Sequence, residues 1–207
     1  MYLGAANNPV KFGPLVLLIC WLWFDQRPNQ ERQREKLFQA LLAGTSGLVI
    51  GRALALFLPL RARPQFRSDL LLAYPLDPAL RTWSAFPSDR AVFAFALAAS
   101  LVRVSPTAGV WAFAHAALVI GLPRVYFGLH HPSDLLGGAM IGILAAATVA
   151  WLPEKQTGQR VVVRLQPQQP ALFYAFGFLF LYEVMTMFDG LRSVANVVFD
   201  FLRHIRA

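Results

Sequence analysis

The sequence predicts an all-α fold: a polytopic membrane protein built as a six-helix transmembrane bundle. Hydrophobic residues make up 57% of the 207 residues and charged residues only 14%, whereas about 25% charged residues is typical of a soluble domain. The mean hydropathy is +0.48. The apolar residues also gather in six long stretches and do not form recurring ten-residue segments of alternating polarity, which argues against a transmembrane β-barrel.

The six apolar stretches follow one another along the whole chain. They are Val10–Phe24, Leu37–Leu60, Ala91–Val104, Thr107–Pro123, Leu135–Leu152 and Ala171–Phe188. Several are shorter than the roughly 20 residues that a membrane span needs, so we expect the helices to extend into the flanking polar residues. Met1–Pro9 lacks a basic segment, and the first stretch is therefore expected to be a retained helix and not a cleaved signal.

We expect one transmembrane domain over residues 1–207, because the sequence contains neither an internal repeat nor a low-complexity linker. The tail, residues 190–207, has apolar residues at intervals of three and four with polar residues between them. This spacing is typical of an amphipathic helix that lies on the membrane surface or simply packs on the bundle.

The chain has a formal net charge of +8. In a soluble protein this charge would suit nucleic acid, but in a membrane protein it places basic loops against anionic headgroups. We therefore expect membrane lipids, and not nucleic acid, as partners. Cys20 is the only cysteine, which excludes an intramolecular disulfide and a cysteine-based metal site. His115, in the middle of a stretch, is interpreted as a core histidine.

Three short segments at one end of the predicted bundle are rich in groups that bind phosphate. In the third segment, Arg124, His130 and Asp134 precede or open an apolar stretch that begins with Pro-Ser-Asp. This pattern predicts a helix start, with His130 just before the helix and Asp134 in its first turn. A carboxylate there can accept from one imidazole nitrogen and leave the other free as a nucleophile. Arg124 offers a bidentate fork for phosphate oxygens.

The second segment, residues 86–90 (Phe-Pro-Ser-Asp-Arg), also predicts a helix start, whose N–H groups and positive dipole end favour an anion. The first segment contains Arg52, Arg61 and Arg63-Pro64. Arg52 lies inside an apolar stretch, where an ionisable residue is functional by default. Its side chain can extend toward the site face; a structural pairing with a carbonyl or with Asp134 is the alternative.

Together the three segments resemble the signature motifs of the type-2 phosphatidic acid phosphatase superfamily of lipid phosphate phosphatases. Those motifs are Lys, six residues, Arg-Pro; then Pro-Ser-Gly-His; then Ser-Arg, five residues, His, three residues, Asp. The third motif matches in spacing through Arg124, His130 and Asp134, with Pro123 in the place of the serine.

The other two motifs match in part. Arg63-Pro64 matches the end of the first, and residues 86–89 resemble the Phe-Pro-Ser-Asp-His form of bacterial undecaprenyl-diphosphate phosphatases. The resemblance covers roughly residues 52–142, and a bundle of six helices agrees with the family fold.

The resemblance implies a membrane phosphatase acting on a lipid phosphate or, most specifically, a polyprenyl diphosphate of the bacterial envelope. His130 would take the phosphoryl group as phosphohistidine, Asp134 would orient it, and Arg90 would occupy the position of the residue that serves the leaving group. No cofactor and no metal would be needed. The residues expected to bind the substrate are Arg52, Arg61, Arg63, Ser88 and Arg124.

Two positions depart from the family pattern. Leu56 stands seven residues before Arg63, where the family has lysine; Arg52, one helical turn further back, projects from about the same face and is a candidate substitute. Arg90 stands where the family has a histidine that protonates the leaving group. Arginine binds phosphate but does not give up its proton, and losing a general acid typically costs about 10²–10⁴-fold in rate.

Arg90 leaves two interpretations open. A lipid monophosphate must expel an alkoxide, which needs a proton, whereas a diphosphate expels a phosphate monoester that charge alone can stabilise. Arg90 therefore either selects diphosphate substrates or inactivates the enzyme. The second hypothesis is accordingly a catalytically inactive relative that binds or carries a polyprenyl phosphate or phospholipid. The third hypothesis is a non-catalytic membrane subunit. It leaves the convergence of Arg63, Arg124, His130 and Asp134 unexplained.

The distribution of basic residues predicts the orientation. With six spans, both chain ends and the three segments lie on one side, which has ten Lys and Arg residues against eight on the other. Four of the ten belong to the segments themselves. Without them, the side that holds the segments has six basic residues and the other side has eight. Because cytoplasmic loops carry the excess of Lys and Arg, this difference places the segments outside the cytoplasm. We expect a multi-pass protein of the bacterial inner membrane whose site faces the extracytoplasmic side.

Overall fold

The computed structural model describes residues 8–26, 28–66, 83–152 and 166–189. In this part of the chain every regular element is a helix, which confirms the all-α prediction. The elements are α2 (Asn8–Phe24), α3 (Gln30–Phe57), η1 (Pro64–Phe66), α4 (Asp89–Val104), α5 (Pro106–His115), η3 (Ala116–Gly121), α6 (Leu122–Tyr126), α7 (Pro132–Ala150), α9 (Gln166–Gln168) and α10 (Pro170–Met185). The predicted amphipathic helix at residues 190–207 lies outside the described residues.

The helices have the length and the surface of a membrane bundle. Among the described residues, three helical stretches are long and apolar enough to cross a bilayer: α3, α7 and the continuous helix Pro106–Tyr126 formed by α5, η3 and α6. The helices α2 and α10 are shorter and also apolar. Large apolar side chains such as Leu17, Leu118 and Phe178 face outward, as lipid contact requires. The chain is thus an all-α membrane protein.

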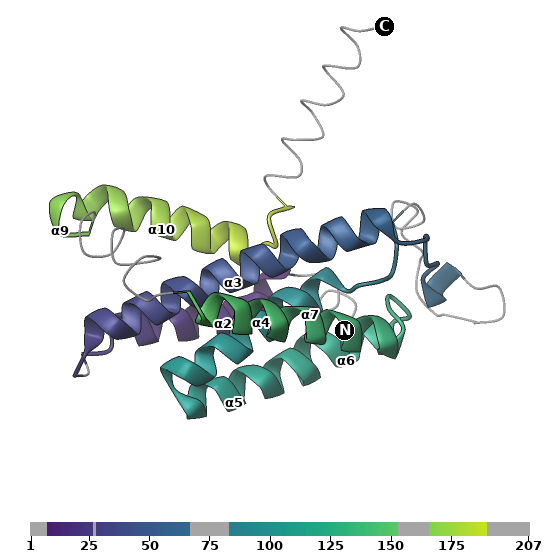
Figure 1. Cartoon of the computed structure of the whole chain (residues 1–207), viewed down its shortest axis with the longest axis horizontal. Helices are drawn as coiled ribbons and strands as arrows, with labels where there is room; N and C mark the ends of the chain where they lie inside the picture. Colours follow the sequence, from purple (N-terminus) through teal and green to yellow (C-terminus); the bar gives the residue numbers. More distant parts are fainter. Residues whose placement is uncertain (1–7, 27, 67–82, 153–165, 190–207) are drawn as a thin grey trace, which may run out of the picture.

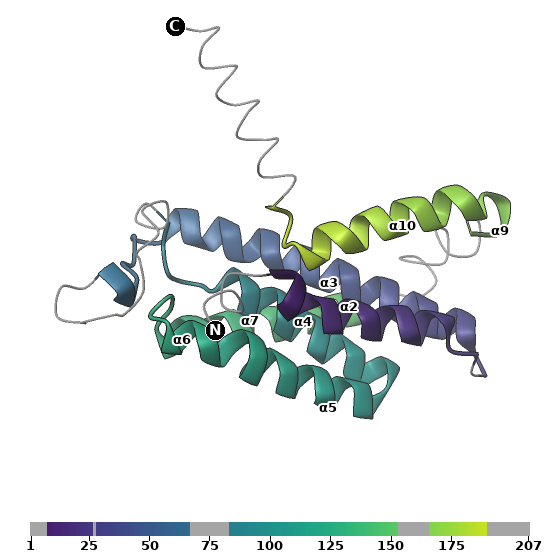
Figure 2. The same ribbon diagram turned by 180° about the vertical axis from the view of Figure 1, so that it is seen from behind.

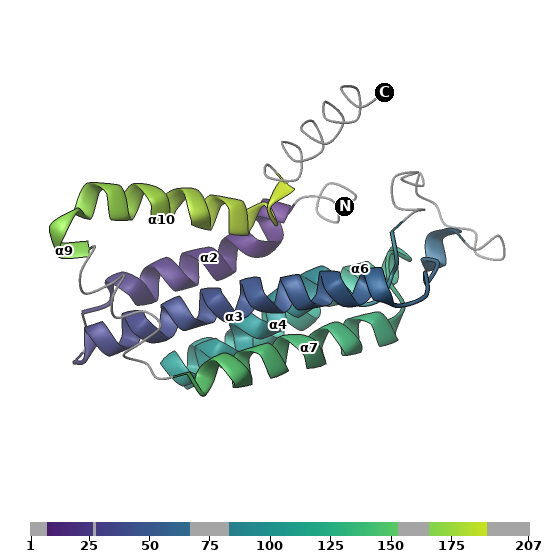
Figure 3. The ribbon, with the colours of Figure 1, turned by 45° about the horizontal axis from the view of Figure 1, so that its top comes forward.

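The long helices run roughly along one direction (Figure 1). The view in Figure 3 shows α10 as the outermost helix beside α2, with α3 between α2 and α7. Seen from behind, α2 runs between α10 and α5 (Figure 2). At the end of the bundle where α3 and α6 finish, η1 and the loops before α4 and α7 come together.

Two helices extend well past their apolar stretches into the flanking residues, as the shortness of the stretches predicted. α3 begins at Gln30 and not at Leu37, because its polar first turns are held by contacts outside the apolar stretch, among them the Lys36 ammonium donating to the Arg103 carbonyl at 2.9 Å. The fourth stretch was expected to end at Pro123, but the helix continues to Tyr126.

A π-helical turn explains how the helix passes Pro123. Proline has no N–H and disrupts a regular α-helix, and the turn Ala116–Gly121 widens the backbone just before it. The Leu122 N–H bonds to the Ala117 carbonyl, five residues back. Such turns occur frequently at functional sites. The helix therefore continues past the proline, and Arg124 in its last turn is buried.

The centre of the bundle is α4, which packs against α3, α5 and α7. Its contact with α7 is close because Gly138 and Gly142 lie on the facing side of α7, in the small-xxx-small spacing of membrane helix pairs. A Cβ on Gly142 would lie 2.3 Å from the Val92 carbonyl oxygen, and one on Gly138 would lie 2.8 Å from the Ser88 carbonyl oxygen. The starts of α4 and α7, where the second and third segments lie, are therefore held against each other.

Gly142→Ala should destabilise the bundle, because the new methyl group would overlap the backbone of α4. We expect a loss of about 1–3 kcal/mol, the usual cost of overpacking, seen as a lower Tm of the detergent-purified protein. Gly177→Ala on α10 is the matched control, since a Cβ there meets nothing within 4 Å; its stability should change by no more than about 1 kcal/mol. Equal Tm values for the two variants would contradict the packing argument.

Candidate active site

The loop between α6 and α7 places His130 beside the end of α6. The carbonyl oxygen of Arg124 accepts hydrogen bonds from the N–H groups of Leu129 at 2.9 Å and His130 at 3.2 Å. Gly128 has φ 64, a left-handed conformation that glycine adopts without strain. The five residues between Arg124 and His130 thus form a tight loop that returns the chain to the buried end of α6.

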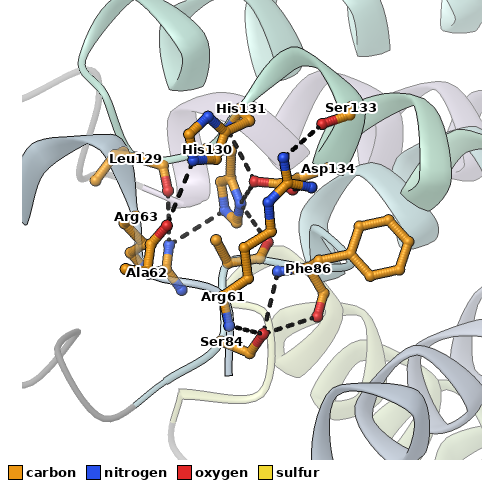
Figure 4. A network of polar contacts seen from close by, with 11 residues as sticks. Arg61, Ala62, Arg63, Ser84, Phe86, Leu129, His130, His131, Ser133 and Asp134 are labelled. Carbon is orange, nitrogen blue, oxygen red and sulfur yellow. Dashed lines mark hydrogen bonds and ion pairs between the residues drawn. The ribbon is translucent and has the colours of Figure 1, made fainter. Parts of the chain in front are cut away.

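His130 is held in one tautomer with its Nε2 available. Its Nδ1 lies 2.8 Å from the carbonyl oxygen of Ala85 (Figure 4). A carbonyl only accepts, so Nδ1 carries the proton and Nε2 carries the lone pair. The Nη1 of Arg63 lies 3.3 Å from Nε2, and the imidazole is 4% exposed. The unprotonated nitrogen of His130 therefore faces a guanidinium group.

The surroundings keep His130 neutral. Burial lowers the pKa of His130 from its usual 6.5 to about 4; the charges of Arg124 and Arg63 act in the same direction, and together they outweigh the opposing effect of Asp134. This shift leaves the imidazole uncharged at neutral pH, with the lone pair of Nε2 unprotonated.

Asp134 lies next to His130 without being its hydrogen-bond partner. Its Oδ2 is 3.8 Å from His130 Nδ1 and accepts the N–H of His131 at 2.8 Å, at the start of α7. Its Oδ1 binds the guanidinium of Arg61 at 2.7 Å. The sequence predicted that a carboxylate would fix the tautomer; in the structure the carbonyl of Ala85 lies within hydrogen-bond distance, and Asp134 adds its charge from further away.

Arg61 lies at the outer side of the site, where its guanidinium contacts two residues of α7. Besides Asp134, its guanidinium donates to the Ser133 hydroxyl at 3.0 Å and is 41% exposed. Its backbone carbonyl accepts the Ala85 N–H at 2.8 Å, which joins the first segment to the residue just before the second. Arg61 therefore holds Asp134 and the loop that carries Ala85.

Arg52 reaches the start of α4. Its guanidinium binds the Asp89 carboxylate at 2.7 Å and lies 4.4 Å from the centre of the Trp83 ring. The alternative of a structural pairing is thus realised, with Asp89 as the partner in place of Asp134 or a carbonyl. Leu56, at the position of the family's lysine, is 84% exposed and faces away from the bundle.

The inner cations are Arg63, Arg90 and Arg124. Arg63 and Arg124 are buried, and Arg63 Nη1 also donates to the Leu129 carbonyl at 3.0 Å. Arg90, in the first turn of α4, is half-buried. The charges of Arg90 and Arg63 both act on Arg124, and those of Arg124 and Arg63 act on His130.

A lysine that the sequence analysis did not single out belongs to the same region. Lys11, in α2, is 2% exposed, and the charges of Arg124 and Arg90 act on it. The signal that could have identified it is the one that identified Arg52, an ionisable residue inside an apolar stretch.

The buried polar atoms of this region without a hydrogen-bond partner in the described part of the chain include three donors, the Ser88 hydroxyl, Arg124 Nε and Gln65 Nε2. Ser88 is the N-cap residue of α4, yet its hydroxyl does not cap the helix. Buried donors without acceptors are costly. Three of them beside a buried cation cluster favour an oxyanion with several acceptor oxygens as the missing partner.

Comparison with known proteins agrees with the motifs. The model of the PAP2 superfamily matches residues 21–157, which include all three segments. The chain is 25% identical over 150 residues to the bacitracin transport permease protein BcrC of Bacillus licheniformis, covering 72% of this chain and 69% of that protein. It is 26% identical over 131 residues to the undecaprenyl-diphosphatase BcrC of Bacillus subtilis (strain 168), covering 63% and 62%.

A third relative is the putative undecaprenyl-diphosphatase YbjG of Escherichia coli (strain K12), 27% identical over 177 residues, which cover 78% of this chain and 76% of that protein. No solved structure matches the chain significantly.

The lowered pKa of His130 predicts a pH dependence of stability. The folded protein takes up this proton less readily than the unfolded chain, so the contribution is fully present above pH 6.5 and is lost as the pH falls from 6.5 through 4. The difference amounts to about 3 kcal/mol. We expect the Tm of His130→Asn, whose amide can still donate to the Ala85 carbonyl, to fall less than that of the wild type between pH 7 and pH 4. Equally steep profiles would contradict the shift.

Proposed function

Because this chain belongs to the PAP2 superfamily, we propose that it is a membrane-embedded phosphatase acting on a lipid phosphate, with a polyprenyl diphosphate as the favoured substrate. The observation that carries the proposal is the buried His130, with Nδ1 fixed by the Ala85 carbonyl and Nε2 directed at Arg63. The relative from Bacillus subtilis is named an undecaprenyl-diphosphatase and the one from Escherichia coli a putative undecaprenyl-diphosphatase. These names support the choice of substrate.

In the first step of the proposed reaction, the lone pair of His130 Nε2 attacks the terminal phosphorus. A P–N bond forms, the bond from phosphorus to the bridging oxygen breaks, and the bridging oxygen leaves with the electron pair as part of the lipid monophosphate. Nδ1 keeps its proton throughout and donates it in a hydrogen bond to the Ala85 carbonyl oxygen. The positive charge that develops on the imidazole is stabilised by that bond and by Asp134.

In the second step, water attacks the phosphorus of the phosphohistidine. The P–N bond breaks, its electron pair returns to Nε2, and inorganic phosphate leaves after the water has lost a proton to solvent or to the phosphate. Arg63 and Arg124 stabilise the equatorial oxygens in both transition states, and the Ser88 hydroxyl and Gln65 amide donate to them. Arg61 is a positioning residue that acts through Asp134, and Arg52 acts through Asp89.

The same assignment makes the reaction independent of metal ions. The charge that a metal ion would supply to a phosphoryl group is provided here by the buried guanidinium groups of Arg63 and Arg124. We place the reaction in the bacterial inner membrane with the site on the extracytoplasmic side; the distribution of basic residues supports that orientation.

Arg90 supports a second candidate function. It lies in the inner cation group, where it can stabilise a leaving phosphate by charge but cannot protonate a leaving alkoxide. If that charge is insufficient for turnover, the same site would bind a polyprenyl phosphate or phospholipid without hydrolysing it. Phosphate release from a panel of diphosphate and monophosphate lipids distinguishes a phosphatase from such a binding protein.

His130→Ala should abolish phosphate release, by about 10³-fold or more, since removing a nucleophile leaves only binding and electrostatic stabilisation. His131→Ala is the matched control: this neighbouring imidazole lies on the exposed side, 3.4 Å from the Ala62 carbonyl oxygen, and activity should persist. EDTA should leave the wild-type rate unchanged. Turnover in His130→Ala at a rate close to the wild type would exclude His130 as the nucleophile.

Arg90→His should raise activity unevenly across substrates. Histidine can protonate the leaving oxygen, which a departing alkoxide needs far more than a departing phosphate. We expect monophosphate lipids to gain most, within the range of about 10²–10⁴-fold for a general acid, and diphosphate lipids to gain less.

The rates of wild type and Arg90→His on both lipid classes, measured across pH, test this expectation. The variant should acquire a new limb in its pH profile from the introduced imidazole. Equal gains on both substrate classes would refute the leaving-group argument, and no gain on either would show that the site is limited elsewhere.

A further inference from the structure

Ser84, in the loop before α4, has a hydroxyl group that the proposed reaction does not use. Its Oγ accepts the N–H of Arg61 at 3.3 Å and the N–H of Phe86 at 3.4 Å, and it donates to the Phe86 carbonyl oxygen at 3.2 Å (Figure 4). A hydroxyl group has one donor and two acceptor positions. These three contacts therefore use its full capacity, and an alanine at this position would remove all of them.

The contact with the Phe86 N–H sets the direction of the Ala85 carbonyl. The two groups belong to one planar peptide unit, and in a trans unit the C=O and the N–H point in opposite directions. The Phe86 N–H is directed at the Ser84 hydroxyl. The Ala85 carbonyl therefore points to the opposite side, where its oxygen lies 2.8 Å from His130 Nδ1. The preceding peptide unit is fixed as well, because the Ala85 N–H donates to the Arg61 carbonyl at 2.8 Å.

The ring of Phe86 holds the same loop against α7. A Cβ on Gly137 would lie 2.4 Å from Phe86 Cε2 and 2.8 Å from its Cζ, so the ring packs directly on the backbone of α7. Gly137 comes three residues after Asp134, in the first turns of that helix. The loop is thus attached to Arg61 by hydrogen bonds and to α7 by an aromatic ring.

His130 Nδ1 has two acceptors in its neighbourhood. The Ala85 carbonyl oxygen is 2.8 Å away, and Asp134 Oδ2 is 3.8 Å away. A carboxylate is the stronger acceptor because it is charged. Turning the ring toward it would move Nε2 relative to Arg63 Nη1, which lies 3.3 Å from it. The neutral carbonyl is the nearer partner because its peptide unit is held in place.

We propose that Ser84 is a positioning residue of the active site, which acts on His130 through the Ala85 carbonyl. It keeps Nδ1 on this neutral acceptor and away from Asp134, so that Nε2 stays directed at the phosphoryl group beside Arg63. This inference rests on the proposed function and adds a residue to its site. Ser84 does not touch the substrate, so its removal should affect the rate of the chemical step more than substrate binding.

The choice of acceptor also affects how readily His130 takes up a proton. The charges of Arg63 and Arg124 disfavour a protonated imidazole, whereas Asp134 favours it. The other oxygen of Asp134 is paired with Arg61 at 2.7 Å. If Nδ1 turns from the carbonyl to the carboxylate, the interaction that favours the charged form grows, and the pKa of His130 should rise.

The test is Ser84→Ala in the full-length protein in detergent. NMR follows the imidazole signals of the four histidines across pH, and His130→Asn identifies the signal of His130. We expect Ser84→Ala to raise the pKa of His130 by about one unit. It should lower kcat for phosphate release from farnesyl diphosphate by about tenfold, the rate equivalent of a lost hydrogen bond, and change KM by less than about threefold. Ser84→Thr keeps the hydroxyl and should restore both the pKa and kcat.

Two controls separate the change of acceptor from a general loosening of the site. Ser46→Ala removes a half-buried hydroxyl that donates to the Ala43 carbonyl at 3.2 Å within α3, and both values should stay at those of the wild type. In the Asp134→Asn background, Ser84→Ala should leave the pKa of His130 in place, because no carboxylate remains for Nδ1 to approach.

An unchanged pKa of His130 in Ser84→Ala, or an equal rise in the Asp134→Asn background, would overturn the positioning role, while phosphate release by the wild type would still support the proposed function. If Ser84→Ala does not fold, Gly137→Ala takes its place: the new methyl group would displace the Phe86 ring and should raise the same pKa, and an unchanged value would overturn the role of this loop. A wild type that hydrolyses no lipid would overturn the proposed function, whereas a raised pKa in Ser84→Ala would still support the link from Ser84 to His130.

Discussion

The close approach of α4 to α7 is the constraint on which the rest of the site depends. Gly138 and Gly142 let the two backbones approach so closely that no side chain fits between them, and the Ser88 N–H then donates to the Asp134 carbonyl at 3.2 Å. In a membrane, where apolar burial does little to hold helices together, such backbone proximity is the main source of association. Backbone contacts alone therefore hold the second and third segments together.

The same proximity sets the chemistry of His130. The loop before α4 is held against α7, so the Ala85 carbonyl reaches Nδ1 at 2.8 Å and commits the imidazole to one tautomer. On the other side of α4, Gly51 packs on Val92 and brings the end of α3, and with it the loop of Arg63, to the same place. The packing of α3, α4 and α7 thus determines the direction in which the lone pair of His130 Nε2 points.

The sequence was sufficient for the fold class, for the six apolar stretches and for the three segments, because hydropathy and motif spacing are local properties. It was insufficient for the bond from His130 to Ala85, since a backbone carbonyl has no residue type to recognise. The π-helical turn before Pro123 was also missed; proline suggests a helix end, and only the packing of the helix shows that it continues. Lys11 was passed over because it stood alone, far in sequence from every motif.

Arginines that look equivalent in the sequence fall into two groups in the structure: those that bind carboxylates and those that lie near His130. Arg52 and Arg61 each bind a carboxylate at 2.7 Å, and these carboxylates, Asp89 and Asp134, belong to the motifs themselves. The negative charge of the site is therefore directed outward, toward the outer arginines, and the face of His130 Nε2 is left to Arg63 and Arg124. A carboxylate turned inward would compete with a phosphate for those cations. Each acid is offset by an arginine of its own, although Asp134 still lies 3.8 Å from His130 Nδ1 and the charge of Asp89 still acts on Arg124.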